Sequence, residues 1–112
     1  MSDGVFATLR GLLAAHEAKF VVRRNEPDNY YLETVTKDGK PEMFAAVQIK
    51  KSYVSFHLFP AYIDPSLLSD IPADLLKRMQ GKSCFNFGPR HQIPIDQLTA
   101  LVGKCAKMSL AR

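Results

Sequence analysis

The sequence predicts a single α+β domain, in which an antiparallel sheet of about five strands forms a two-layer structure with N-terminal and C-terminal helices. Two observations predict this class. Apolar residues recur with a helical period near each end of the chain, and consecutive strand-like segments joined by turn signals fill the middle. The 112 residues contain no linker, repeat or low-complexity tract, so we expect one domain over residues 1–112.

Both terminal helices are predicted from apolar stripes with a 3.6-residue repeat. Ser2 or Asp3 is the expected N-cap of the first helix, because either side chain can accept a backbone N–H bond. The last helix is expected to begin at Pro94. The two stripes are Val5, Leu9, Leu12, Leu13 and His16 in the first helix, and Ile95, Leu98, Leu101, Val102, Cys105 and Met108 in the last.

Strands and turns are predicted between these helices. The expected strands cover residues 19–23, 30–36, 42–50, 53–59 and 83–87. Asp38-Gly39 predicts a hairpin with a type I′ turn, which requires positive φ at both central positions. A helix is expected from Asp70-Ile71-Pro72 onward, with Gly81 just past its end as the left-handed C′ residue.

Alternation along the strands predicts which residues share a face of the sheet. One face is entirely apolar and is expected to pack against the helices: it carries Met43, Ala45, Val47, Ile49, Val54, Phe56 and Leu58. The opposite face, which we call the mixed face, is expected to present Phe44, Ala46, Gln48, Lys50, Tyr53, Ser55, His57 and Phe59.

Composition favours a cytoplasmic protein. Only two cysteines occur, Cys84 and Cys105, whereas small secreted domains rely on several disulfides. We see neither a secretory signal nor an apolar run of the ~20 residues that a membrane helix needs. The net charge of +4 is spread along the chain, which argues against a nucleic-acid partner.

Three motifs carry a resemblance to a known family: Tyr53-Val-Ser-Phe-His-Leu-Phe-Pro60, Lys77-Arg-Met-Gln-Gly-Lys-Ser-Cys-Phe-Asn-Phe87 and Ile93-Pro-Ile-Asp-Gln-Leu98. On these motifs the chain resembles the YdhG-like family of small bacterial domains, most of them of unknown function. The resemblance covers about residues 40–102 and implies an antiparallel sheet flanked by helices. One branch is described as frataxin-like intracellular iron chaperones, which bind iron on an acidic surface. Here the first helix offers only Asp3 and Glu17 and the protein is net basic, so we do not expect the iron role. No pair among His57, His91, Cys84 and Cys105 has a recognised ligand spacing, so we assign no residues to a metal site.

Known chemical motifs are matched only in part. Gly81-Lys82-Ser83 lacks the first glycine of a phosphate loop and precedes a strand rather than a helix. His57 beside Ser55 or Cys84 suggests a nucleophile and a base, but no third orienting acid can be identified. We therefore expect neither catalytic residues nor a cofactor, and an enzyme remains an alternative that requires a strongly shifted pKa at His57 or Cys84.

The mixed face is the predicted functional surface, because it sets a few polar groups among aromatic side chains, as ligand pockets do. We predict a non-enzymatic binding or chaperone-like module for a small ligand, metal or protein partner, present as a monomer or homodimer. The alternative is an anion- or nucleic-acid-binding protein that uses Lys50, Lys51, Lys82 and Arg90. The candidate ligand-binding residues are Gln48, Lys50, Tyr53, His57, Lys82, Cys84 and Asn86.

Overall fold

The computed structural model describes residues 2–112, with side chains from residue 4 onward. The expected caps Ser2 and Asp3 therefore lie outside the described side chains. The elements, in chain order, are α1 (Ser2–Ala14), η1 (Glu17–Lys19), β1 (Val21–Glu26), β2 (Asn29–Val35), β3 (Pro41–Ile49), β4 (Val54–Leu58), α2 (Phe59–Ile63), η2 (Pro65–Leu68), α3 (Ala73–Leu76), β5 (Met79–Gln80), β6 (Cys84–Phe87) and α4 (Ile95–Ala111).

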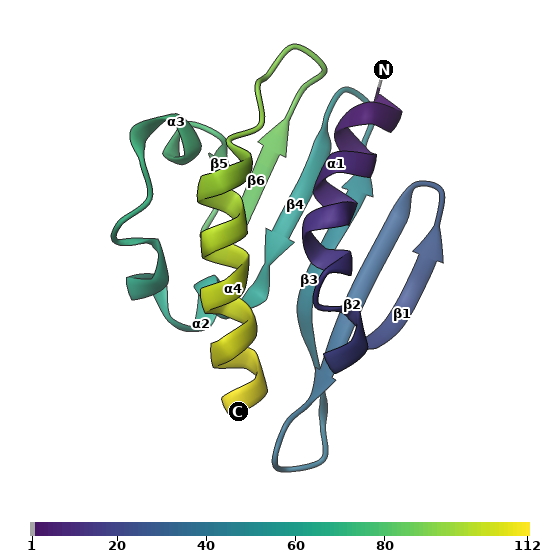
Figure 1. The fold of residues 1–112 in the computed structure, drawn as a ribbon, viewed down its shortest axis with the longest axis vertical. Helices are drawn as coiled ribbons and strands as arrows, with labels where there is room; N and C mark the ends of the chain where they lie inside the picture. The colour runs from purple at the N-terminus through teal and green to yellow at the C-terminus, as the bar shows by residue number, and fades with distance from the viewer. Residues whose placement is uncertain (1) are drawn as a thin grey trace.

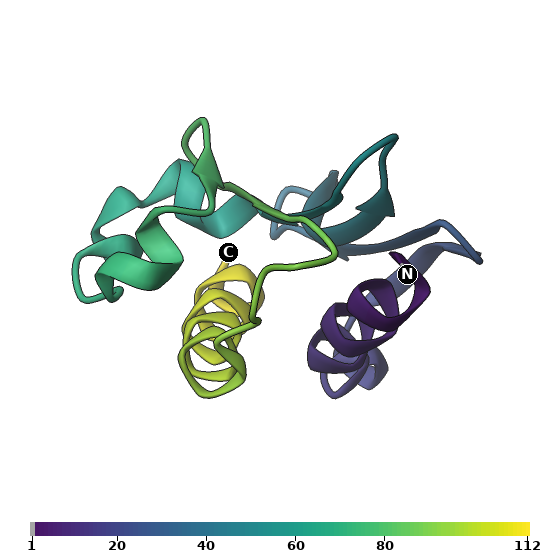
Figure 2. The same cartoon turned by 90° about the horizontal axis from the view of Figure 1, so that it is seen from above.

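The six strands form one antiparallel sheet in the order β1-β2-β3-β4-β6-β5. The two long helices, α1 and α4, lie side by side on one face of this sheet (Figures 1 and 2). The predicted α+β class, with helices at both ends of an antiparallel sheet, is confirmed. The additional strand is β5, whose two residues occupy the place where the sequence predicted the end of a helix.

The hydrophobic core lies between the sheet and the two long helices. Tyr30 and Leu32 of β2, with Phe56 of β4, are fully buried in it. The core residues from the helices are Phe6, Leu9, Leu13, Leu98, Leu101, Val102, Cys105 and Ala106. Ile95 was expected in the stripe of the last helix but is 48% exposed, because it occupies the first turn, beyond the edge of the core.

A β-bulge changes the predicted faces of β3. Leu32 pairs with Ala45 and Glu33 pairs with Met43, which leaves Phe44 as an extra residue. The side chain of Phe44 is fully buried and stacks on Phe20 at 4.0 Å between ring centroids. The assignment of Met43 to the core face and of Phe44 to the mixed face was therefore wrong, because one inserted residue reverses the alternation on one side of it.

Local turns also differ from the sequence-based expectation. The hairpin at residues 36–40 is confirmed, but only Gly39 has a positive φ, so the turn is not type I′. The helix expected after Asp70 is limited to the single turn α3. Gly81 does have a positive φ of 80°, but it lies in the turn between β5 and β6 rather than at a helix end. Phe59, expected in a strand, begins α2 instead.

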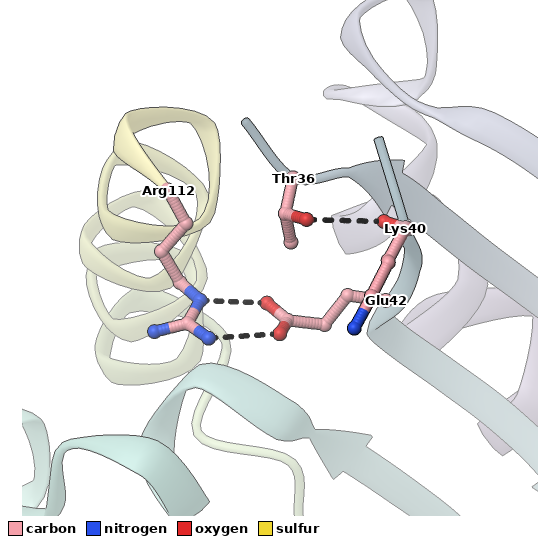
Figure 3. Close-up of polar contacts among 4 residues, drawn as sticks. All are labelled: Thr36, Lys40, Glu42 and Arg112. Carbon is pink, nitrogen blue, oxygen red and sulfur yellow. Dashed lines mark hydrogen bonds and ion pairs between the residues drawn. The ribbon is translucent and has the colours of Figure 1, made fainter. Parts of the chain in front are cut away.

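The C-terminal end of α4 is attached to the β2–β3 hairpin (Figure 3). The Arg112 guanidinium donates from Nε and Nη2 to the two carboxylate oxygens of Glu42, at 2.8 and 2.9 Å. The Lys37 backbone N–H also donates to the Arg112 carbonyl at 2.9 Å. A bidentate pair of this kind fixes direction as well as distance, so it holds the last turn of α4 beside the hairpin.

Candidate functional site

Neither of the two long helices covers the mixed face of the sheet, because α1 and α4 both pack on the opposite side (Figure 2). Two rows of paired residues cross this face. The rows are Tyr31, Ala46, His57, Cys84 and Gln80 in one, and Asn29, Gln48, Ser55 and Asn86 in the other. Polar groups thus dominate a surface that α1 and α4 leave uncovered.

A pocket of about 360 Å³ opens where this face meets α2 and the β5–β6 turn. Its polar lining comes from β4, β5, β6 and the β5–β6 turn, and its aromatic lining comes from α2. The lining residues are His57, Phe59, Tyr62, Gln80, Lys82, Ser83 and Cys84. A second hollow of about 540 Å³ shares Tyr62 and Lys82 with this pocket and is otherwise lined by Pro65, Leu68 and Met79. The two hollows therefore meet at Tyr62 and Lys82.

The aromatic wall is built by the short helix α2. Pro60 is tolerated in its first turn because the N–H it lacks would have no partner there. Phe59 and Tyr62 are three residues apart, so their rings lie on one side of the helix, with centroids 5.8 Å apart. The Lys82 ammonium lies 5.9 Å from the centre of the Tyr62 ring, in the range of a cation–π contact.

Inside the pocket, His57 pairs with Ser83. The Ser83 Oγ and the His57 Nε2 are 2.7 Å apart, although the residues are 26 positions apart in the chain. Sheet register explains this contact: His57 lies opposite Cys84, and the Leu58 N–H donates to the Ser83 carbonyl at 2.9 Å. Burial lowers the pKa of the His57 imidazole, so its neutral form is favoured at neutral pH.

Cys84 stands beside this pair without joining it. Its Sγ contacts the Asn86 Oδ1 at 3.7 Å, on the neighbouring row. Burial raises the pKa of the Cys84 thiol, and the charge of Lys50 lowers it by less. The thiol therefore stays protonated at neutral pH, which makes it a poor nucleophile.

The seven candidate residues divide into groups. His57, Lys82 and Cys84 meet in the pocket. Gln48 and Asn86 lie on the second row of the mixed face, to either side of Ser55. Lys50 and Tyr53 belong to the β3–β4 turn, at the end of β4 away from α2, where the Lys50 N–H donates to the Tyr53 carbonyl at 2.8 Å.

Four pocket residues were missed as candidates: Phe59, Tyr62, Gln80 and Ser83. Phe59 and Tyr62 have the i, i+3 spacing that places two side chains on one side of a helix, so a helix prediction at this position would have identified them together. Ser83 was considered only as part of a phosphate motif, and its approach to His57 depends on the register between β4 and β6, which no local pattern reveals.

A hollow at the other end of the molecule is less suited to a ligand. It measures about 580 Å³ and lies between the β2–β3 hairpin and the end of α4. Two of its charged groups, Arg112 and Glu42, already pair with each other (Figure 3). A ligand that bound Arg112 or Glu42 would have to replace this bidentate pair.

Residues that could bind a metal ion are not clustered in the described part of the chain. Among the side chains of residues 4–112, no three His, Cys, Asp or Glu residues are grouped closely enough to hold a metal ion. Glu17, expected in the first helix, lies in η1, where its carboxylate accepts a hydrogen bond from the Tyr30 phenol. These residues do not fit an iron site.

Comparisons with known proteins identify no relative: no protein-family model, curated protein or solved structure matches the chain. Among the described residues, no helix combines the length and apolar character that are needed to cross a bilayer.

Proposed function

We propose that the protein is a binding module for a small organic ligand that has an aromatic or apolar body and an anionic group. We also propose that the chain belongs to the YdhG-like family, but membership of that family would not identify a ligand. The observation that carries the proposal is the convergence of the Tyr62 ring, the Lys82 ammonium and the His57–Ser83 pair in one pocket of about 360 Å³.

Each part of the pocket supports a part of this ligand. The exposed Tyr62 ring and Phe59 offer a surface on which a planar group can stack. Lys82 supplies a positive charge beside that surface, and no carboxylate within 4.0 Å neutralises it among the residues that the structure describes. The adjoining hollow at Pro65, Leu68 and Met79 would receive an apolar extension. Pockets of this volume and lining are typical of small-molecule sites.

The proposal is tested by titration with three probes of similar shape: benzoate, benzyl alcohol and benzamidine. Chemical shifts of backbone amides report where each probe binds. We expect benzoate to bind best and to shift residues 57–62 and 80–84. Lys82→Gln should weaken benzoate about tenfold, which is the loss of one charge-assisted contact. Lys107→Gln, which removes an exposed charge on α4, is the matched control. Equal binding of all three probes, or shifts spread over the surface, would exclude the proposal.

Salt separates this function from the anion- or nucleic-acid-binding alternative. Benzoate affinity should change little between ~50 and ~200 mM salt, because one charge is involved, whereas binding to a polyanion falls steeply with salt. The basic residues expected to bind a polyanion do not form one cluster. Lys50 and Lys51 lie in the β3–β4 turn, whereas Lys82 lies at the opposite end of β4. Tight, salt-sensitive binding of an oligonucleotide would favour the alternative.

A further inference from the structure

We propose that the same pocket carries acyl-transfer activity, in which Ser83 is the nucleophile and His57 is its general base. The inference rests on the proposed ligand pocket and adds a reaction to it, so it departs from the expectation of a non-enzymatic module. The substrate class is an activated ester of an aromatic alcohol, with the aryl ring on Tyr62 and the acyl carbon at Ser83.

The geometry of the pair carries this proposal. A nucleophile and its base must lie within hydrogen-bond reach, and the Ser83 Oγ to His57 Nε2 distance of 2.7 Å meets that requirement without any rearrangement. Both side chains line the pocket. Ser83 is only 5% exposed in total and lines the pocket, so we take the pocket as the route by which a substrate reaches its hydroxyl.

The electrostatics of the site suit this division of roles. His57 is held neutral by burial, as a base must be before it accepts a proton. Lys82 and Gln80 lie one and three residues before Ser83, and both line the pocket. An ammonium and an amide N–H placed there can stabilise the negative charge that develops on the carbonyl oxygen.

The other candidate nucleophiles are less well placed. The Cys84 thiol is kept protonated by burial and contacts Asn86 rather than His57. Ser55 lies on the neighbouring row of the sheet, opposite Gln48 and Asn86. The structure thus replaces the pairing suggested by the sequence, His57 with Ser55 or Cys84, by His57 with Ser83.

The reaction balances with water as the second reactant. The Ser83 Oγ attacks the ester carbonyl carbon while its proton passes to the His57 Nε2. The tetrahedral intermediate collapses, the bond from carbon to the alcohol oxygen breaks, and His57 returns the proton to the departing alcohol. Water then attacks the acyl-serine with His57 again as base, which releases a carboxylic acid and restores Ser83. Among the side chains of residues 4–112, His57 is bonded to Ser83 and no carboxylate orients its ring, so we expect slow turnover.

The test uses the intact protein and 4-nitrophenyl acetate, with nitrophenol release followed by absorbance and the protein mass followed in parallel. We expect one acetyl group per chain, mapped by peptide mass to Ser83. His57→Ala should lower the acylation rate by about 100-fold or more, the usual contribution of a general base, and added imidazole should restore part of it. Ser55→Ala, on the same face but outside the pocket, should acylate as the parent does.

Folding and binding are controlled separately. Ser83→Ala should abolish the label, and Ser83→Cys, which keeps a nucleophile at the position, should retain labelling there. Circular dichroism and benzoate titration show whether each variant is folded and its pocket intact. An acetyl group on lysines or Cys84, or an unchanged rate in Ser83→Ala, would overturn the activity. If benzoate still bound in that case, the binding function would stand without it.

Discussion

The two faces of the sheet are built from the same strands but differ in chemistry from one residue to the next. On the helix side, one cross-strand row consists of Tyr30, Val47, Phe56, Phe85 and Met79, and the first four are fully buried. The adjacent row, facing away from the helices, consists of Tyr31, Ala46, His57, Cys84 and Gln80. The pleat alone thus separates the residues that stabilise the fold from those that form the candidate site.

This separation has a consequence for what each face tolerates. The buried rings are packed on all sides, so a change of volume there has no solvent-filled space to use. On the mixed face only Ala46 and Ser55 of the two rows are buried, and the other side chains of these rows are at least partly exposed. Substitutions at the even-numbered positions of β4, which face the core, should therefore change the free energy of unfolding most. Substitutions at the odd-numbered positions should instead change ligand binding.

The strongest test of this comparison is Phe56→Ala. Phe56 is fully buried between Val47 and Phe85 on the neighbouring strands, so its truncation should lower the free energy of unfolding by about 3–5 kcal/mol. Urea denaturation measures the loss. Gln48→Ala, on the mixed face of the adjacent strand, should cost about 1 kcal/mol or less. A loss below ~1 kcal/mol for Phe56→Ala would mean that the two faces are exchanged.

Sequence patterns predicted the core face of β4 correctly because that strand alternates without interruption. They failed at Met43 and Phe44, since a bulge adds one residue without any local composition signal, and only the pairing with Leu32 and Glu33 exposes it. His57, Lys82 and Cys84 were predicted as site residues, but their meeting in one pocket depends on tertiary register. Ser83 was missed for the same reason, because its partner lies on a strand that is distant in sequence.

A second test concerns the turn that carries Lys82 and Ser83. Gly81 has a φ of 80°, a left-handed conformation that any side chain with a Cβ disfavours, so Gly81→Ala should destabilise the protein by about 1–2 kcal/mol. Gly103 has ordinary helical dihedrals within α4 and open space where a Cβ would lie. Gly103→Ala should therefore stabilise the protein by about 1 kcal/mol.

The opposite signs of these two substitutions are the informative result, and thermal unfolding of both variants gives them. Benzoate binding should also weaken in Gly81→Ala, because Lys82 and Ser83 follow directly in the turn, and should stay unchanged in Gly103→Ala. If both substitutions changed the thermal stability in the same direction, the left-handed conformation assigned to Gly81 would be wrong.

The smallest expected effect concerns pH and His57. Burial lowers the pKa of this imidazole in the folded state, so folding favours its neutral form. Its contribution to stability is fully present above the unfolded pKa of about 6.5 and is lost as the pH falls toward and through the lowered folded pKa. Comparing the parent with His57→Gln in urea at a series of pH values isolates this contribution, because carboxylates that titrate in both proteins cancel.

The difference in stability between parent and variant should shrink as the pH falls below about 6.5 and stay constant above it. The same imidazole should control acylation of Ser83, whose rate should fall as the pH passes through the lowered folded pKa, where His57 of the folded protein takes up a proton. A rate that instead rose on acidification would separate the titration of His57 from the chemistry of the pocket. A rate midpoint at the acidic end of the range over which the stability difference shrinks would show that one residue links the stability of the mixed face to its reactivity.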